Sequence, residues 1–132
     1  MPYEYTIDAK RRRVRIRMWG TLSKGEILTL IGDLQRDPRL SAAFSELIDL
    51  REASTEQIGG DEVREIAAAA LDPASRRAFV VPDSLTYGLA RMFGTLREVE
   101  GARERIAVFR SPDAAETWLD AGEDRTEGLN DS

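Results

Sequence analysis

The stretch RRAFVVPDSLTYGLARMF, residues 76–93, contains the junction that decides the fold. Residues 77–81 (RAFVV) read as a continuous apolar strand, which is typical of a central strand covered on both faces. Pro82 ends this run, and Asp83 or Ser84 can cap a helix that starts there. The apolar residues of that helix recur at the spacing of one helix face, and they are Leu85, Leu89, Met92, Phe93 and Leu96. A buried strand that leads directly into an amphipathic helix predicts a βα unit, from which α/β proteins are built.

The same pattern occurs in the segments on either side of this junction. Residues 44–50 (FSELIDL) predict a strand, and a helix is predicted for residues 61–71 after a polar loop. The inward-facing residues of that helix are Val63, Ile66, Ala67 and Ala70. Residues 105–109 (RIAVF) predict the last strand of the chain.

The N-terminal part of the chain predicts a hairpin and one further helix. Residues 3–8 (YEYTID) and 13–19 (RVRIRMW) alternate apolar and polar side chains, and their short connector predicts an antiparallel pair. The sequence SKGE is a capping box, in which Glu26 answers the Ser23 hydroxyl at the start of a helix. The apolar stripe of this helix consists of Ile27, Leu30, Ile31 and Leu34.

The C-terminal part predicts a capped helix followed by a tail. Residues 111–122 (SPDAAETWLDAG) place Ser111 at the N-cap and Gly122 just past the helix end. Residues 123–132 lack apolar periodicity, so we expect a loosely held polar C-terminal tail. Because no repeat or linker divides residues 1–122, we expect them to form one domain.

The predicted order of elements is therefore ββαβαβαβα. Three consecutive βα units require right-handed crossovers and a largely parallel sheet with helices packed against it. The first strand of the hairpin adds an antiparallel member. We expect an α/β fold, a single domain with a mixed, mostly parallel sheet.

Composition excludes several classes of function. The 132 residues carry a formal net charge of -5, which argues against nucleic-acid binding because that requires a basic surface. The chain has no cysteine and no histidine, so we expect no metal site, no cofactor and no enzyme activity. No apolar run approaches the roughly 20 residues of a membrane span. The N-terminus lacks the pattern of a signal peptide, so we expect a cytoplasmic protein.

Four phrases of the sequence together resemble the SpoIIAA-like family: RIRMWGTLSKGEILTLIGDL, ELIDLR, RRAFVVPDSLTYGLARMFGTL and ERIAVFRSPDAAETWL. Its members are bacterial domains related to the STAS fold of anti-sigma-factor antagonists and to the lipid-binding CRAL-TRIO fold. The resemblance runs from the first predicted strand to Leu119, and GLARMF and VFRSPDAAETWL are its most specific parts. Because these are patterns of ordinary residues, the resemblance implies a fold more strongly than an activity.

The resemblance also implies a phosphorylation switch, from which this sequence departs. Anti-sigma-factor antagonists carry an Asp-Ser-Ser-Gly-like motif at the start of the helix after the third strand. Here that region reads REASTEQIGGDEV, and Gly59 falls about where the switch serine should be. Ser54 and Thr55 lie earlier in the loop, away from the helix N-terminus where a phosphate would act. We expect the switch to be absent, which leaves the binding of another protein open.

Polar residues near the ends of the predicted strands form a candidate binding site. Ligands of open α/β sheets bind beyond the carboxyl ends of the strands. An arginine at such a place can bind a carboxylate or phosphate through two parallel hydrogen bonds. Tyr87 and Arg91 share one helix face because they are four residues apart. The candidates for ligand or partner binding are Asp49, Arg51, Asp83, Ser84, Tyr87, Arg91 and Arg110.

These residues also have structural explanations. A helix cap accounts for Asp83 or Ser84, and Arg91 can pair with a nearby acid such as Glu98 or Asp49. Residues 10–13 (KRRR), the basic cluster of the chain, are expected to form a solvated turn.

Two functional hypotheses follow. The first is a non-enzymatic, STAS-like regulatory or protein-interaction module that self-associates, with the helix of residues 84–99 and the loop of residues 51–60 as its contact surface. The second is a binder of a small amphipathic or acidic ligand in a cleft near Arg51, Tyr87 and Arg91. A pocket with apolar walls behind the two arginines would favour the ligand, and a flat exposed apolar patch would favour the interaction.

Overall fold

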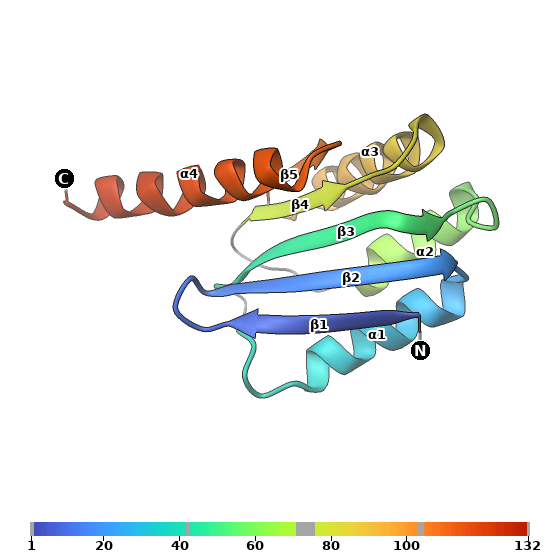
Figure 1. The fold of residues 1–132 in the computed structure, drawn as a ribbon, viewed down its shortest axis with the longest axis horizontal. Coiled ribbons are helices and arrows are strands. Elements are labelled where there is room, and N and C mark those ends of the chain that lie inside the picture. Colours follow the sequence, from blue (N-terminus) through green and yellow to red (C-terminus); the bar gives the residue numbers. More distant parts are fainter. Residues whose placement is uncertain (1, 42, 71–75, 103–104, 132) are drawn as a thin grey trace.

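The computed structural model describes residues 2–41, 43–70, 76–102 and 105–131 (Figure 1). Its elements are β1 (Tyr3–Asp8), β2 (Arg13–Thr21), α1 (Lys24–Arg36), β3 (Ser45–Ser54), α2 (Gly60–Ala69), β4 (Arg76–Val80), α3 (Ser84–Val99), β5 (Arg105–Phe109) and α4 (Pro112–Asp131). This order and the mixed, mostly parallel sheet confirm the predicted α/β fold.

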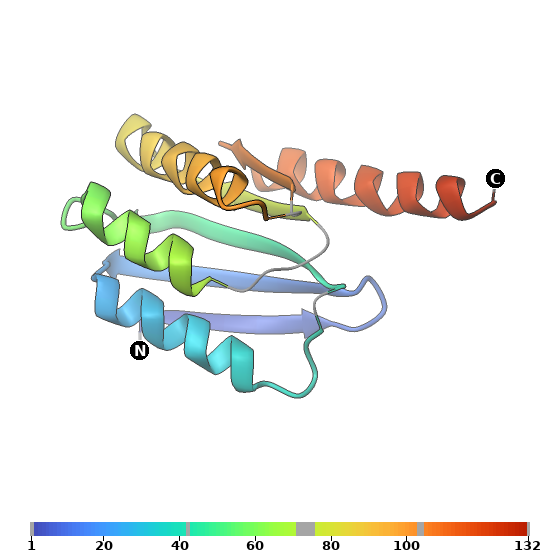
Figure 2. The same cartoon turned by 180° about the vertical axis from the view of Figure 1, so that it is seen from behind.

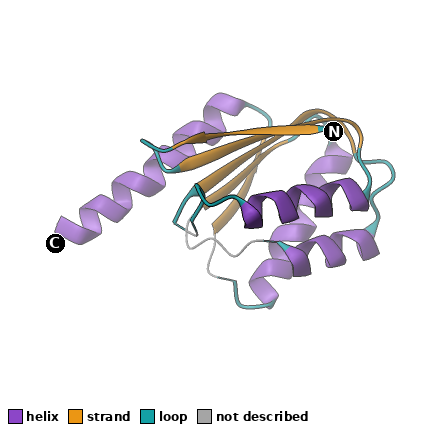
Figure 3. Ribbon diagram, turned by 90° about the horizontal axis from the view of Figure 1, so that it is seen from below, coloured by secondary structure: helices purple, strands orange, loops and turns teal. Residues whose placement is uncertain are grey.

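The sheet places every strand beside its neighbour in the chain. The strand order is β1-β2-β3-β4-β5, with β1 antiparallel to β2 and the other pairs parallel. Right-handed crossovers between adjacent parallel strands put each connecting helix on the same face. The helices α1, α2 and α3 therefore cover one face (Figure 2), whereas α4, which follows the last strand, packs on the opposite face (Figure 3).

Two apolar cores lie on the two faces of the sheet. The main core fills the space between the sheet and α1–α3, where Phe79 and Phe93 meet edge to face with ring centroids 5.5 Å apart. Alternate residues of β4 enter the two cores, so this strand is buried on both faces, as its apolar run predicted. The smaller core under α4 consists of Leu47, Ala78, Val80, Ala115 and Leu119.

Side-chain caps begin α1 and α3 as the sequence predicted. Ser23 and Glu26 form the capping box of α1. Of the two cap candidates for α3, Asp83 is the N-cap, and its carboxylate accepts a hydrogen bond from the Thr86 amide at 2.8 Å. Such caps typically contribute about 1 kcal/mol each, so they fix where the two helices start.

Two arginines of β2 hold α4 against the sheet. Arg13 is fully buried and binds Glu116 and, at 2.9 Å, Asp120. Arg15 donates to Glu116 at 2.7 Å. The expectation of a solvated turn at residues 10–13 is therefore wrong for Arg13, because β2 begins at this residue and directs it toward α4.

The C-terminal helix is longer than predicted. α4 continues past Gly122, the predicted helix end, to Asp131, over the residues that we expected to form a loosely held polar tail. A Cβ atom at Gly122 would clash with the Arg76 side chain, so this glycine makes room for the arginine and does not end the helix. Although α4 is long, no helix in the described part of the chain has the hydropathy needed to cross a membrane.

Other elements also differ from the predicted ones. β3 extends to Ser54, beyond the predicted end at Leu50, and its pairing with β2 contains a register shift. α2 ends at Ala69, and residue 71 of the predicted helix lies outside the described residues. Leu85 fits the apolar spacing of α3 but is 54% exposed, because the first turn of the helix presents it outside the core.

Leu119→Ala is expected to lower the free energy of unfolding by about 2–5 kcal/mol, because this leucine is 1% exposed in the core under α4. The matched control is Leu85→Ala at the exposed leucine of α3, where the change should stay within about 0.5 kcal/mol. Urea unfolding measures both values. Equal changes in the two variants would contradict the packing of α4 on the sheet.

The ion pairs under α4 also make stability depend on pH. The hydrogen bond from Arg15 is the main reason why the pKa of Glu116 lies below its ordinary value, although partial burial acts in the opposite direction. Because the pKa is lower in the folded state, Glu116 contributes stability above its unfolded pKa. This contribution is lost as the pH falls through the folded pKa.

Glu116→Gln is therefore expected to destabilise the protein at about pH 7 and to cost much less at about pH 3, where the wild-type carboxyl is largely protonated in the unfolded chain. Urea unfolding of both proteins at the two pH values checks this. Glu98→Gln, at an exposed glutamate of α3, is the control and should show little effect at either pH. A Glu116 effect that does not change with pH would contradict the role of the ion pairs.

Candidate functional site

Three of the seven strand-end candidates lie together. Asp83 and Ser84 begin α3, and Arg110, directly after β5, donates to the Ser84 hydroxyl at 3.4 Å. Hydrogen bonds from the amide and the side chain of Thr86 hold the pKa of Asp83 below its ordinary value, and the charge of Arg110 acts in the same direction. This cluster sits where the carboxyl ends of β4 and β5 meet, as the sequence predicted for strand-end residues.

Asp49 and Arg51 form a separate pair on the opposite face of the sheet. Ile48 and Leu50 pack into the main core, so alternation turns their neighbours Asp49 and Arg51 toward the face that carries α4. The Nε and Nη2 atoms of Arg51 donate to the two carboxylate oxygens of Asp49, at 3.0 and 2.8 Å. Burial raises the pKa of Asp49, but the hydrogen bonds from Arg51 outweigh it and leave the pKa below its ordinary value.

Tyr87 and Arg91 lie on the outward face of α3, where both side chains are exposed. The inward face of this helix carries Thr86, Ala90, Phe93 and Arg97. The structure therefore brings together Asp83, Ser84 and Arg110 but does not bring Tyr87 and Arg91 into one cleft with Asp49 and Arg51. The binding roles of all seven residues stay predictions.

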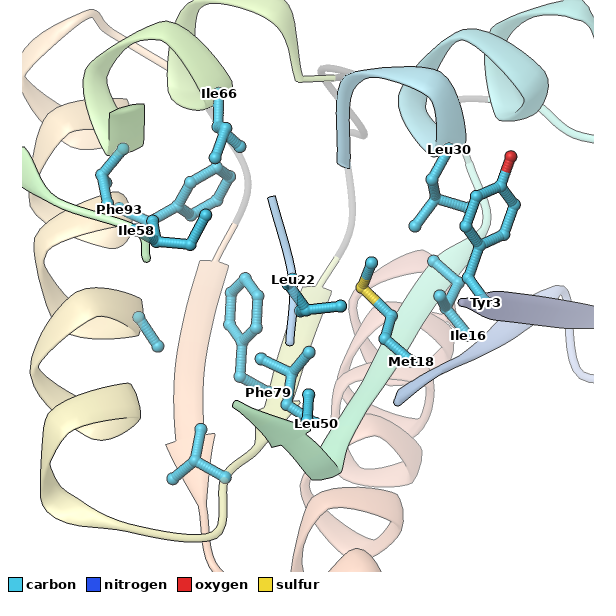
Figure 4. Packing of buried hydrophobic residues seen from close by; sticks show 14 of the residues in the cluster. Tyr3, Ile16, Met18, Leu22, Leu30, Leu50, Ile58, Ile66, Phe79 and Phe93 are labelled. Atoms are coloured by element: carbon cyan, nitrogen blue, oxygen red, sulfur yellow. The ribbon is translucent and has the colours of Figure 1, made fainter. Parts of the chain in front are cut away.

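A cavity of about 130 Å³ lies within the main core, between the sheet and the three helices on that face. β2, β3 and β4 form its floor, and Figure 4 shows Met18, Leu50 and Phe79 pointing from the sheet toward the helices. The helices contribute a roof that includes Ile27, Leu30, Val63, Ile66, Leu89 and Phe93. Nearly all of the lining is apolar, which is the usual character of a small-molecule site.

A buried ion pair interrupts this apolar lining. Glu46 of β3 and Arg77 of β4 are cross-strand neighbours, and both are buried. The Nε and Nη2 atoms of Arg77 donate to the two carboxylate oxygens at 3.1 and 3.3 Å. The guanidinium also lies 5.3 Å from the centroid of the Phe93 ring. The two charges neutralise each other. Either charge alone would be costly to bury at this position, because it would have no counter-charge.

A pair of hydroxyl groups forms the second polar feature of the lining. Thr55 follows β3 and Thr86 lies in the first turn of α3; both side chains are buried, and their Oγ1 atoms are 2.8 Å apart. The pair lies near the carboxyl end of β3, whereas Glu46 lies near its start. The cavity therefore has an ionic contact at one end of this strand and a neutral hydroxyl contact at the other.

The cavity lining contains few titratable groups. Its titratable groups among the described residues are Glu46 and Arg77, and these bind each other. Within the ranges that the structure describes, no three acidic, histidine or cysteine side chains gather in a way that could hold a metal ion.

The polar residues of this cavity were not among the site residues predicted from the sequence. A signal was present, because Glu46 alternates in step with Ile48 and Leu50, and Arg77 with Phe79 and Val81, at the inward positions of their strands. Two opposite charges at inward positions of neighbouring strands predict a buried pair. The cavity itself has no counterpart in the sequence, because its volume depends on how closely three helices approach the sheet.

Comparison with known proteins identifies the fold. No protein-family model and no curated protein matches the chain. A solved structure with 13% sequence identity and a TM-score of 0.53 covers 89% of this chain and 93% of its own. It is an uncharacterized protein of the DUF3478 family from Shewanella loihica PV-4 with a SpoIIAA-like fold. The chain is therefore an α/β domain with a SpoIIAA-like fold, as the resemblance in its sequence implied.

Arg77→Leu is expected to lower the free energy of unfolding by about 3–5 kcal/mol, because it leaves the Glu46 carboxylate buried without its counter-charge. The double variant Glu46→Leu with Arg77→Leu should recover most of this loss, since apolar residues then replace the whole pair. Urea unfolding measures both. Lys24→Met, which removes an exposed pair with Glu65, is the control and should cost less than about 1 kcal/mol. A double variant as unstable as the single one would contradict the assignment.

Proposed function

We propose that this protein is a non-enzymatic binding protein that holds a small, mainly apolar ligand in the cavity between its sheet and helices α1–α3. The observation that carries the proposal is a cavity of about 130 Å³ whose walls come from three strands and three helices. A well-packed core has few voids larger than a water molecule, so an opening of this size is a feature to be explained.

The size and polarity of the cavity define the ligand class. An apolar cavity of roughly 150 Å³ in another protein binds benzene, so this one suits a molecule of about one ring or a short aliphatic chain. Burying such a molecule gains the hydrophobic transfer energy, about 25 cal/mol for each Å² of apolar surface. Glu46 binds Arg77 and Thr55 binds Thr86, so an apolar ligand can occupy the cavity without breaking either contact.

This site differs from the predicted strand-end cleft. Arg51 and Arg91, the cations expected to hold an acidic ligand, do not belong to the cavity lining. Arg77 does, but the adjacent Glu46 carboxylate already neutralises it. The lining therefore supports a neutral ligand over an acidic one.

The interaction hypothesis has one observation in its favour. Leu85 and Tyr87, in the first turn of α3, are among the exposed large hydrophobic residues of the described chain. They lie next to Ser84 and its contact with Arg110, within the predicted contact surface. A protein-interaction role, self-association and a cytoplasmic location stay predictions.

Filling the cavity tests the proposed function. Toluene is expected to raise the melting temperature of the wild-type protein, because a ligand that binds the folded state stabilises it. Ala90→Leu places a larger side chain at the cavity wall and is expected to abolish the effect of toluene. Because the added carbons occupy existing space, the substitution should cost less than the roughly 1–3 kcal/mol of overpacking a filled core.

Ala68→Leu is the matched control, at an exposed alanine of α2, and should respond to toluene like the wild type. Thermal unfolding at increasing toluene concentration gives all three responses. An unresponsive wild-type protein, or an equal response in the Ala90 variant, would contradict binding in this cavity.

A further inference from the structure

The last strand of the sheet, β5, is an apolar edge strand. Among the described residues it pairs with β4 on one side and with no strand on the other (Figure 1). After Arg105 its sequence is IAVF, and all four of these side chains are partly exposed although they are apolar. Soluble proteins usually protect an edge strand with charges, prolines or bulges, because an open apolar edge pairs with other strands. β5 has no proline, and its one charge is at its first residue.

The backbone of β5 presents hydrogen-bonding groups at this open edge. The Val81 amide donates to the Phe109 carbonyl at 2.9 Å, so Phe109 directs its backbone groups toward β4. Successive residues of a strand alternate in this direction. Ala107 therefore also faces β4, whereas Ile106 and Val108 direct their N–H and C=O groups away from it. Within the described part of the chain, no residue binds these outward groups.

The opposite edge of the sheet is protected in the usual way. β1 carries Glu4 and Asp8 on one face, where they form ion pairs with Arg17 and Arg15 of β2. Charged side chains along an edge strand discourage the addition of another strand. The two edges therefore differ, and the chemistry of β5 is the one that suits strand pairing.

β5 is complementary to a second copy of itself. In an antiparallel pair with Ile106 opposite Val108 of the second copy, each of these residues exchanges both of its backbone hydrogen bonds, so every outward group is satisfied. Ala107 then lies opposite its counterpart, where the Cα atoms approach to about 4.5 Å and a small side chain fits. Arg105 lies opposite Phe109, so no like charges face each other. Any shift of register pairs Ile106 or Val108 with a residue beyond the strand.

Helix α3 places exposed side chains beside the same edge. A Cβ atom at Gly94 would lie 3.5 Å from the Cγ2 atom of Ile106, so the face of α3 that carries Gly94 adjoins β5. Tyr87 and Arg91 share this face because of their helical spacing from Gly94, and both are exposed. The open edge therefore borders part of the contact surface predicted from the sequence, the helix of residues 84–99.

We propose that the protein forms a symmetric dimer through β5, in which Ile106 pairs with Val108 of a second copy and the two-fold axis passes at Ala107. Such an interface is isologous, because each copy contributes the same strand. The two sheets become one continuous sheet, in which backbone hydrogen bonds join the copies and the apolar side chains of β5 lose their exposure at the edge. The dimer does not depend on the ligand proposed for the cavity.

Sedimentation velocity of the wild-type protein tests the dimer directly. We expect a dimer with a dissociation constant of about 10 μM or below. A wild-type protein that stays monomeric at about 0.1 mM would overturn the proposal.

Two substitutions at Ala107 test the surface and the register together. Ala107→Lys places two ammonium groups opposite each other at the axis, and Ala107→Asp places two carboxylates there. Each variant alone is expected to weaken the dimer at least about tenfold. An equimolar mixture should restore it, because each lysine then faces an aspartate. Ala68→Lys, at an exposed alanine of α2, is the matched control and should dimerise like the wild type.

The variants can contradict the proposal in two ways. A wild-type dimer that Ala107→Lys does not weaken would place the interface elsewhere. Two monomeric variants with the circular dichroism of the wild type that fail to associate when mixed would show that the register is wrong.

Amide hydrogen exchange in the wild-type dimer decides the question even if the variants do not fold. The amides of Ile106 and Val108 are expected to exchange at least about tenfold more slowly than that of Tyr5, after correction for intrinsic rates. Trp19 donates to the Pro2 carbonyl, so alternation directs the Tyr5 amide to the open edge of β1, which stays unpaired in this dimer. Exchange at Ile106 and Val108 as fast as at Tyr5 would overturn the proposal.

Discussion

The right-handed crossover is the constraint on which the rest of this structure depends. Because β2, β3, β4 and β5 are adjacent and parallel, their three connecting helices must lie on one face of the sheet. That face must be apolar across several strands, and the cavity lies between it and the helices. The opposite face receives α4, which is centred on β3, β4 and β5. β2 can therefore direct Arg13 and Arg15 toward that face, where the acids of α4 bind them.

The elements could be predicted from the sequence because their signals are local. The apolar run of β4, the capping box at Ser23 and the cap at Asp83 each need only neighbouring residues. Burial is less local. Leu85 has the spacing of a core residue, but the spacing does not show whether anything packs over the first turn of α3. Gly122 resembles a helix end until Arg76, from a distant part of the chain, is placed beside it.

The site could be predicted only in part, for the same reason. The contact of Arg110 with Ser84 joins two strand ends that a parallel sheet must bring together, so the topology was sufficient. The position of Asp49 could have been derived from alternation, because Ile48 and Leu50 enter the main core and force the residue between them to the other face. The cavity is a small difference between the volume enclosed by two layers and the volume of their side chains, and no local pattern encodes that difference.

Thr86 connects the surface cluster that the sequence predicted with the interior site that it did not. Its amide donates to Asp83 at the start of α3, and its Oγ1 contacts Thr55 in the cavity wall. The residue whose amide the cap binds therefore also contributes to the polar part of the cavity. Ser84 and Arg110 lie on the outer side of the same helix start. Ligand binding and partner binding, which were separate hypotheses from the sequence, thus concern two sides of a single helical turn.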